Sequence, residues 1–318
     1  MSAPATPNSV SAGRAKTVWV ALAAGVLITV AKVVASVITS SPALAAEASH
    51  SLADNGNDLF LLVAGHRAQR PRDDQHPFGY GREAYFWALL AALGVFVTGA
   101  AFSLREGIDE LLHPSATTSF TLAYVILGLS AALDLVSFRQ SAGQMNLEAQ
   151  QAHRSIMGQA VATSDPSLRA VFTEDAVSVA GDLFALAGLA LSQIIGSSAP
   201  QAIAAVLIAL VLIRISLRLI SRNHDFLVGQ PVQPADRVRV ESFLLTYPGI
   251  TAVDELLVDF IGPDQVWVLA RVQIARELTA SEVTALVREV EPAMQRESDH
   301  IYRVDVVPVG DGDRPDAE

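Results

Sequence analysis

Residues 46–65, AEASHSLADNGNDLFLLVAG, place ionisable side chains inside an apolar run, and this stretch decides how the chain is interpreted. His50 and Asp54 are four residues apart, so on a helix both side chains lie on one face, a turn apart. Burying such groups in lipid is costly, which marks them as a functional-site hypothesis. An imidazole beside a carboxylate supplies half the ligands of a transition-metal site. Asn57 and Asp58 continue this polar face further than a pair that only joins neighbouring helices requires.

The composition indicates an α-helical membrane protein. The 318 residues are 51% hydrophobic and have a mean hydropathy of +0.37, too apolar for an ordinary soluble protein of this length. A membrane span needs about 20 residues. Six runs are long enough and predict a transmembrane domain over residues 17–222, after a polar segment, 1–16, that we expect to be disordered. The predicted spans are residues 18–40, 43–65, 84–104, 120–138, 170–195 and 200–220.

The distribution of charge predicts orientation and excludes some classes of function. The chain has no cysteine, which excludes disulfides, thiolate metal sites and cysteine nucleophiles. From residue 223 onward, 18 Asp and Glu face 8 Arg, which argues against nucleic acid as a partner. Arginines lie within the second-to-third connection and at the end of the sixth run, so both termini are predicted to be cytoplasmic. The absence of cysteine and the scarcity of lysine suit a GC-rich bacterium, and the expected location is the bacterial inner membrane.

The fifth run also carries acids, which suggests one central site built from the second and fifth runs. Asp175 is favoured as a metal ligand. Glu174 points roughly 100° away from it and either contributes to the site or reaches the cytoplasmic interface. Asp182 shares a face with Asp175, and a proton-relay or helix-pairing role competes evenly with ligation.

Other charged groups favour less specific roles. Lys32, inside the first run, is predicted either to reach the membrane surface or to form a structural ion pair with a buried acid such as Asp58 or Asp134. Asp73 and His76, in the second-to-third connection, are the donors of a weak metal site, although a solvated loop is the preferred interpretation.

Residues 223–309 predict a small cytoplasmic α+β domain of order α-β-β-α-β, compatible with a ferredoxin-like sandwich. Gly262 and Pro263 mark the turn between two β-rich runs. Thr279 and Glu282 form a capping-box signature before the second helix. A surface helix is expected over residues 145–161, and the acidic tail, 310–318, is expected to be loose. The predicted elements are a helix from residue 235, strands over 250–261, 265–274 and 301–309, and an amphipathic helix with Val283, Leu286, Val287, Val290 and Met294 on one face.

These features resemble the cation diffusion facilitator family of divalent-metal transporters, over residues 17–309. The most specific stretch is HPFGYGREAYFWALLAALGVFVTGAAFSLREGIDELLHP (76–114), together with AEASHSLADNGND (46–58). The passages VFTEDAVSVAGD (171–182) and SRNHDFLVGQPVQP (221–234) resemble the subgroup that contains the mitochondrial zinc transporter of animals. The resemblance implies six spans, cytoplasmic termini, and a homodimer assisted by the α+β domain. It also implies export of Zn²⁺ or a related ion in exchange for protons, with the ion as substrate and no permanent cofactor.

The resemblance also implies a four-coordinate transport site with two ligands from each of the second and fifth spans. His50 and Asp54 match the first pair. The fifth-span pattern is histidine, three residues, aspartate. With Asp175 as its aspartate, Val171 takes the histidine position; with Asp175 as its histidine, Val179 takes the aspartate position. In both alignments a ligand is missing, and Glu174, Ser178 or water must replace it.

The sequence departs from the family pattern in two further places. Tyr80 stands where some members have another loop histidine beside Asp73 and His76. The C-terminal domain lacks the histidines that bind zinc between subunits in some relatives, so we expect weak or no metal sensing there.

Three alternatives remain open from the sequence. Mn²⁺, Fe²⁺ or Co²⁺ would be carried by the same mechanism. A non-transporting membrane metal sensor or scaffold is consistent with the incomplete fifth-span site. A membrane metalloenzyme is disfavoured, because the sequence has no HExxH run, Ser/His/Asp set or glycine-rich phosphate loop, and we therefore expect the chain not to be an enzyme.

Overall fold

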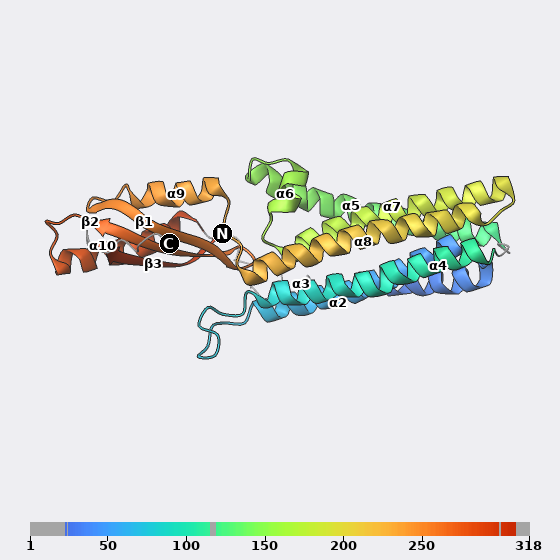
Figure 1. Cartoon of the computed structure of the whole chain (residues 1–318), viewed down its shortest axis with the longest axis horizontal. Coiled ribbons are helices and arrows are strands. Elements are labelled where there is room, and N and C mark those ends of the chain that lie inside the picture. The colour runs from blue at the N-terminus through green and yellow to red at the C-terminus, as the bar shows by residue number, and fades with distance from the viewer. Residues whose placement is uncertain (1–22, 24, 115–118, 299, 310–318) are drawn as a thin grey trace, which may run out of the picture. The chain divides into compact units, whose positions relative to one another are not determined.

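The computed structural model describes residues 23, 25–114, 119–298 and 300–309, which form two compact units (Figure 1). One unit is helical and is built from the chain up to residue 65 and residues 87–223. The other combines residues 66–86 with the chain from residue 224 onward and contains the β-sheet. The predicted disordered segment, 1–16, and the acidic tail, 310–318, lie outside the described residues.

Long helices make up the helical unit, and their ends follow local sequence signals. Ser119 and Asp165 are N-caps whose side chains accept backbone N–H groups, and Pro166 occupies the first turn after Asp165. Gly196 ends its helix in the left-handed conformation, at φ 75°. The helices are Gly25–Thr39, α2 (Pro42–Ala68), α3 (Glu83–Gly94), the π-helical η1 (Val95–Ala100), α4 (Ala101–Leu112), α5 (Phe120–Gln151), α6 (Ile156–Ala162), α7 (Pro166–Ile195) and α8 (Ala199–Val228).

Four of the six predicted spans have the length and composition of membrane helices. They are the continuous helix Glu83–Leu112, α5, α7 and α8. The helix Gly25–Thr39 is apolar but shorter within the described residues, and α2 is long but too polar to meet the same criterion. Among the described residues, four helices are thus long and apolar enough to cross a membrane, and the count of six spans stays a prediction.

The expected surface helix over residues 145–161 is wrong as a single element. Its first half continues α5 to Gln151, because Met145 and Ala149 are buried one turn apart and anchor that end of the helix. The chain then breaks at His153, whose φ is 52°. Ser155 accepts the Gly158 N–H and starts the short helix α6 as a separate element.

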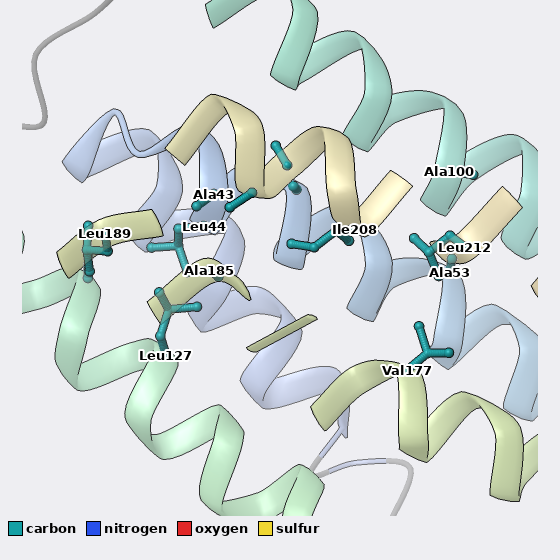
Figure 2. Close-up of a cluster of buried hydrophobic side chains, with 14 of the residues drawn as sticks. Ala43, Leu44, Ala53, Ala100, Leu127, Val177, Ala185, Leu189, Ile208 and Leu212 are labelled. Carbon is teal, nitrogen blue, oxygen red and sulfur yellow. The ribbon is translucent and has the colours of Figure 1, made fainter. Parts of the chain in front are cut away.

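Small residues allow the helices of this unit to pack closely. A Cβ on Gly188 of α7 would lie 2.8 Å from the Ala204 Cβ of α8, and one on Gly107 of α4 would lie 2.7 Å from Val206 Cγ2. Close backbone approach through small residues is the usual means of packing helices in membranes. Figure 2 shows the apolar cluster between these helices, with Leu127 of α5 near α7 and other side chains from α2, η1 and α8.

The second unit confirms the predicted order α-β-β-α-β. Its elements are α9 (Pro234–Leu244), β1 (Ile250–Gly262), β2 (Gln265–Ile274), α10 (Ala280–Glu297) and β3 (Ile301–Val309). The sheet order is β1-β2-β3, with β1 antiparallel and β3 parallel to β2. The predicted turn after Gly262 uses Asp264 at φ 53°. Thr279 and Glu282 make both hydrogen bonds of the predicted capping box.

The core of this unit lies between one face of the sheet and α10. Buried and half-buried residues alternate along β2, as expected for a strand with one covered face. Val268 and Val272 of β2 join Val290 and Met294 of α10 in one buried cluster. The predicted apolar face of this helix is therefore confirmed.

The connection between α2 and α3 belongs to the same unit. The Phe78 ring lies 5.3 Å from Trp267 of β2, and Arg82 Nη2 lies 3.4 Å from Asp259 Oδ2. A Cβ on Gly81 would lie 2.6 Å from the Ile261 carbonyl oxygen, so only glycine permits this approach. Part of the connection is thus packed against the sheet.

Asp305 should make this unit sensitive to acid. Hydrogen bonds from Arg303 and from Trp267 Nε1 lower the pKa of the Asp305 carboxyl. Its stabilisation is complete above the ordinary pKa of about 3.9 and is lost as pH falls through the lower folded-state pKa. An NMR titration of the Trp267 indole N–H should report that low midpoint, and Asp305→Asn should abolish it. A midpoint at or above the ordinary value would contradict this expectation.

Candidate metal centre

His50 and Asp54 lie together on α2, as their spacing predicts. The helix begins directly after Ser41, whose hydroxyl accepts a hydrogen bond from the Leu44 N–H. The His50 side chain is buried, and its Nδ1 lies 3.3 Å from Asp54 Oδ1. No hydrogen bond from the described residues reaches either of these two atoms. The pair therefore presents uncommitted donor atoms to the protein interior.

Ser178 of α7 brings the second helix into this site. Its Oγ lies 3.1 Å from His50 Nε2 and 3.3 Å from Asp54 Oδ2. The same hydroxyl lies 3.1 Å from the Glu174 carbonyl oxygen, one turn earlier in α7. One hydroxyl proton serves only one acceptor at a time. Ser178 is thus the point at which an imidazole nitrogen and a carboxylate oxygen converge.

Glu174 also faces α2. Its buried Oε2 accepts a hydrogen bond from Asn57 Nδ2, while no donor among the described residues reaches its Oε1. Glu174 and Ser178 are four residues apart, which is the spacing expected of the fifth-span pair in the family that the sequence resembles. His50, Asp54 and Ser178 thus converge, and Glu174 presents a carboxylate to the same helix, α2. Imidazole nitrogen and carboxylate oxygen are ligand types that transition-metal ions accept.

The other predicted ligands lie elsewhere. Asp175 Oδ1 accepts a hydrogen bond of 2.9 Å from Ser137 of α5 and makes no recorded contact with His50 or Asp54. Asp58 is exposed, and Asp182 is buried beside Lys32. Within the described ranges, no three His, Asp or Glu side chains are gathered closely enough to hold a metal ion. Ligation by Asp175, Asp58 or Asp182 stays a prediction.

A π-helical segment packs against the same part of α2. A Cβ on Gly99 of η1 would lie 3.2 Å from the Ala53 Cβ and 3.8 Å from the His50 Cα. Single π-helical turns within α-helices occur frequently at functional sites. The absence of a side chain at Gly99 therefore lets η1 approach the backbone that carries His50.

The loop residues Asp73 and His76 form a hydrogen-bonded turn. Asp73 accepts from the backbone N–H groups of Gln75 and His76 and, at 2.7 Å, from the Tyr80 hydroxyl. The Tyr80 hydrogen bond is the main cause that lowers the pKa of Asp73. His76 Nδ1 lies 3.5 Å from Asp73 Oδ1. Two of the residues predicted for a weak loop site are thus adjacent, and their metal binding stays a prediction.

Lys32 forms a buried ion pair, and the predicted partner Asp134 is one of three. Its Nζ lies 3.2 Å from Glu47, 3.6 Å from Asp182 and 3.9 Å from Asp134. Sequence reasoning did not single out Glu47. The available signal was its spacing, since Glu47 precedes His50 by three residues and lies near the same face of the helix.

Helices of membrane length with a buried imidazole and buried acids between them are typical of a polytopic membrane protein. The chain belongs to the family described as the cation efflux transmembrane domain, which matches residues 18–228. This is a family of cation transporters.

Named relatives support this assignment at low sequence identity. The chain is 28% identical, over 82% of its length, to "Proton-coupled zinc antiporter SLC30A9, mitochondrial" of Xenopus laevis, of which the match covers 47%. It is 26% identical to "Putative transporter MamV" of Paramagnetospirillum magneticum, over 95% of this chain and 85% of that protein. It is 29% identical to "Metal cation efflux system protein CzcD" of Cupriavidus metallidurans, over 77% and 71%. The chain spans about half the length of the antiporter.

Among solved structures, part of this chain is similar to the nickel form of a MamM CTD variant. The match covers 24% of this chain and 98% of the solved chain, at 18% sequence identity and a TM-score of 0.23.

Tyr80→Phe should loosen the loop around Asp73. The substitution removes the hydroxyl that lowers the Asp73 pKa, so this pKa should rise toward its ordinary value. Hydrogen exchange at the Gln75 and His76 amides should become several-fold faster, because Asp73 then holds the turn less firmly. Tyr247→Phe, outside this loop, is the matched control and should leave these rates unchanged. Equal exchange in Tyr80→Phe and the parent protein would contradict this role of Tyr80.

Proposed function

We propose that the chain is a secondary transporter that exports divalent cations, with Zn²⁺ favoured, from the cytoplasm in exchange for protons. The observation that carries this proposal is the convergence of His50, Asp54 and Ser178 between α2 and α7. One relative is named as a proton-coupled zinc antiporter, which supports both zinc as the substrate and protons as the counter-ion. The ion is substrate in this proposal, and no permanent cofactor is required.

Four side chains would bind the ion. His50 would supply Nε2, Asp54 and Glu174 would supply carboxylate oxygens, and Ser178 would supply a hydroxyl oxygen. The free Glu174 Oε1 supports this assignment, because a buried carboxylate oxygen without a donor needs a cation or a proton. Asp175 is the alternative ligand, reached by rotation of its side chain or of α7.

Proton exchange follows from the chemistry of these ligands. A metal ion binds neutral imidazole and ionised carboxylates, so loading releases protons from the site. Protons and metal ions both bind to imidazole nitrogen, so an incoming proton competes with the ion for His50. The same atoms would therefore bind the two substrates in turn, while the helices alternate access between the two sides of the membrane.

The polar face of α2 fits a six-span arrangement. An ionisable residue in a membrane faces the interior of the helix bundle, so a site-bearing span is less apolar than its neighbours. In this proposal α2 and the helix Gly25–Thr39 complete six spans. The further proposals are cytoplasmic termini, a homodimer assisted by the α+β unit, and residence in a bacterial inner membrane.

A second substrate set is favoured by the α7 half of the site. Glu174 and Ser178 contribute only oxygen, and harder oxygen ligands shift preference toward Mn²⁺ or Fe²⁺. Transport of Mn²⁺, Fe²⁺ or Co²⁺ would proceed by the same mechanism.

His50→Ala and Asp54→Ala should each abolish transport. Each change removes one donor of the proposed site, and loss of a ligand-supporting group typically costs about 10- to 100-fold in metal affinity. Zinc uptake into inside-out vesicles, driven by an imposed proton gradient, measures this effect. Asp236→Asn in α9 is the control and should transport normally. Unchanged uptake in both site variants would exclude this site.

Glu174→Gln and Asp175→Asn form a matched pair, because each replaces one of two adjacent carboxylates of α7 by a neutral amide. Glu174→Gln should weaken binding of Zn²⁺ to the purified protein by about 10- to 100-fold, whereas Asp175→Asn should change it little. A competition panel of Zn²⁺, Mn²⁺, Fe²⁺, Co²⁺ and Cd²⁺ in detergent measures both affinity and preference. The opposite result would assign ligation to Asp175 and imply that α7 rotates when the ion binds.

A further inference from the structure

Lys32 is the centre of a second buried group of charges. Its ammonium contacts Glu47 of α2, Asp182 of α7 and Asp134 of α5, and it donates to Ser51 Oγ at 2.8 Å. The side chains of Lys32, Glu47 and Asp182 are 1%, 0% and 0% exposed, and that of Asp134 is 28% exposed. One cation is thus surrounded by three acids, two of them fully buried.

With every acid ionised, this group has two more negative charges than positive ones. Such an excess in a medium that solvates charge poorly is strongly unfavourable. Among the described residues, no amide, hydroxyl or ammonium group donates to Glu47 Oε1 or to either oxygen of Asp182. The carboxyl group of Asp182 lies within hydrogen-bonding reach of the carboxyl groups of both Glu47 and Asp134. Two carboxyl groups form a hydrogen bond only when one of them holds a proton.

The backbone of α7 makes room for this arrangement. A Cβ on Gly181 would collide with Glu47 Oε1. The glycine therefore lets the Glu47 carboxylate lie against the backbone of α7, next to Asp182. The close approach is therefore built into the helix pair.

The group lies close to the candidate metal centre along the same two helices. Glu47 precedes His50 by three residues on α2, and Asp182 follows Ser178 by four residues on α7. One helical turn advances by about 5.4 Å. The Lys32 ammonium also interacts electrostatically with His50 and Asp54. A divalent cation placed at His50 would repel any positive charge held one turn away.

We propose that Glu47 and Asp182, with Lys32 as a fixed counter-ion, form a proton-binding site separate from the metal ligands. This inference rests on the proposed antiport function. When the cation binds, the carboxyl O–H bond breaks and the proton leaves to water, so the group changes from −1 to −2 as the metal centre gains two positive charges. When the cation leaves, a proton from the opposite side binds to the same oxygen pair. The charged groups that face this proton are Lys32, Asp134, His50 and Asp54.

Glu47→Gln and Asp182→Asn separate this role from metal binding. Both variants keep the shape of the side chain and the metal ligands but fix one carboxyl as permanently neutral. Tracer exchange of zinc across proteoliposomes without a pH gradient should stay within about twofold of the parent protein, while gradient-driven uptake should fall about tenfold or more. Protons released per zinc bound in detergent should fall by about one.

Asp109→Asn is the matched control, because Asp109 lies on α4 and is paired with His113 outside both charged groups. It should leave exchange, uptake and proton release unchanged. Variants of Glu47 and Asp182 that keep both uptake and the proton release of the parent would overturn the proposal. A parent protein that shows neither exchange nor uptake would instead reject the antiport function itself.

Infrared spectroscopy tests the parent protein directly, without relying on variants that fold. A protonated carboxyl group gives a C=O stretching band that a carboxylate lacks. Near neutral pH the zinc-free protein should show this band, and zinc should remove part of it. The part that zinc removes should be smaller in Asp182→Asn or Glu47→Gln than in the parent protein. Zinc-free parent protein without a protonated-carboxyl band, or with a band that zinc leaves unchanged, would refute the proposal.

Discussion

The cost of holding charge in an apolar interior is the constraint on which the helical unit depends. Each buried ionisable group in α2 and α7 must find an opposite charge, a hydrogen-bond donor, a cation or a proton. Lys32 meets this need for Glu47 and Asp182 in part, and Asn57 meets it for one oxygen of Glu174. Among the needs left unmet, those of His50, Asp54 and the free oxygen of Glu174 lie where the proposed metal cargo would be bound.

Sequence patterns predicted those parts of the molecule that depend on local spacing. The i, i+4 rule placed His50 and Asp54 on one face, and the β-rich composition of residues 265–274 predicted a strand. Neighbouring positions on a helix differ by about 100°, however, so choosing Asp175 rather than Glu174 as the fifth-span ligand selects a different face. Ser178 has no charge to draw attention to it, and its importance comes only from the position of α2 opposite.

Long-range packing decided the features that sequence patterns missed. The polar face of α2 lowers its mean hydropathy, so α2 is not among the four described helices that are apolar enough to span a membrane. The length of α5 depends on burial of Met145 against other helices, and the position of residues 66–86 depends on contacts with strands more than 170 residues later. Such contacts leave no periodic signal in the segments that make them.

The π-helical turn η1 has a consequence for the helix that contains it. A π-helical turn holds an additional residue, which rotates the following helix by roughly 100° relative to an uninterrupted α-helix. The face of α4 that carries Gly107 is therefore phased independently of the face of α3. One continuous membrane helix can thereby follow two neighbours, α2 through Gly99 and α8 through Gly107, with a register that regular helical pitch would not provide.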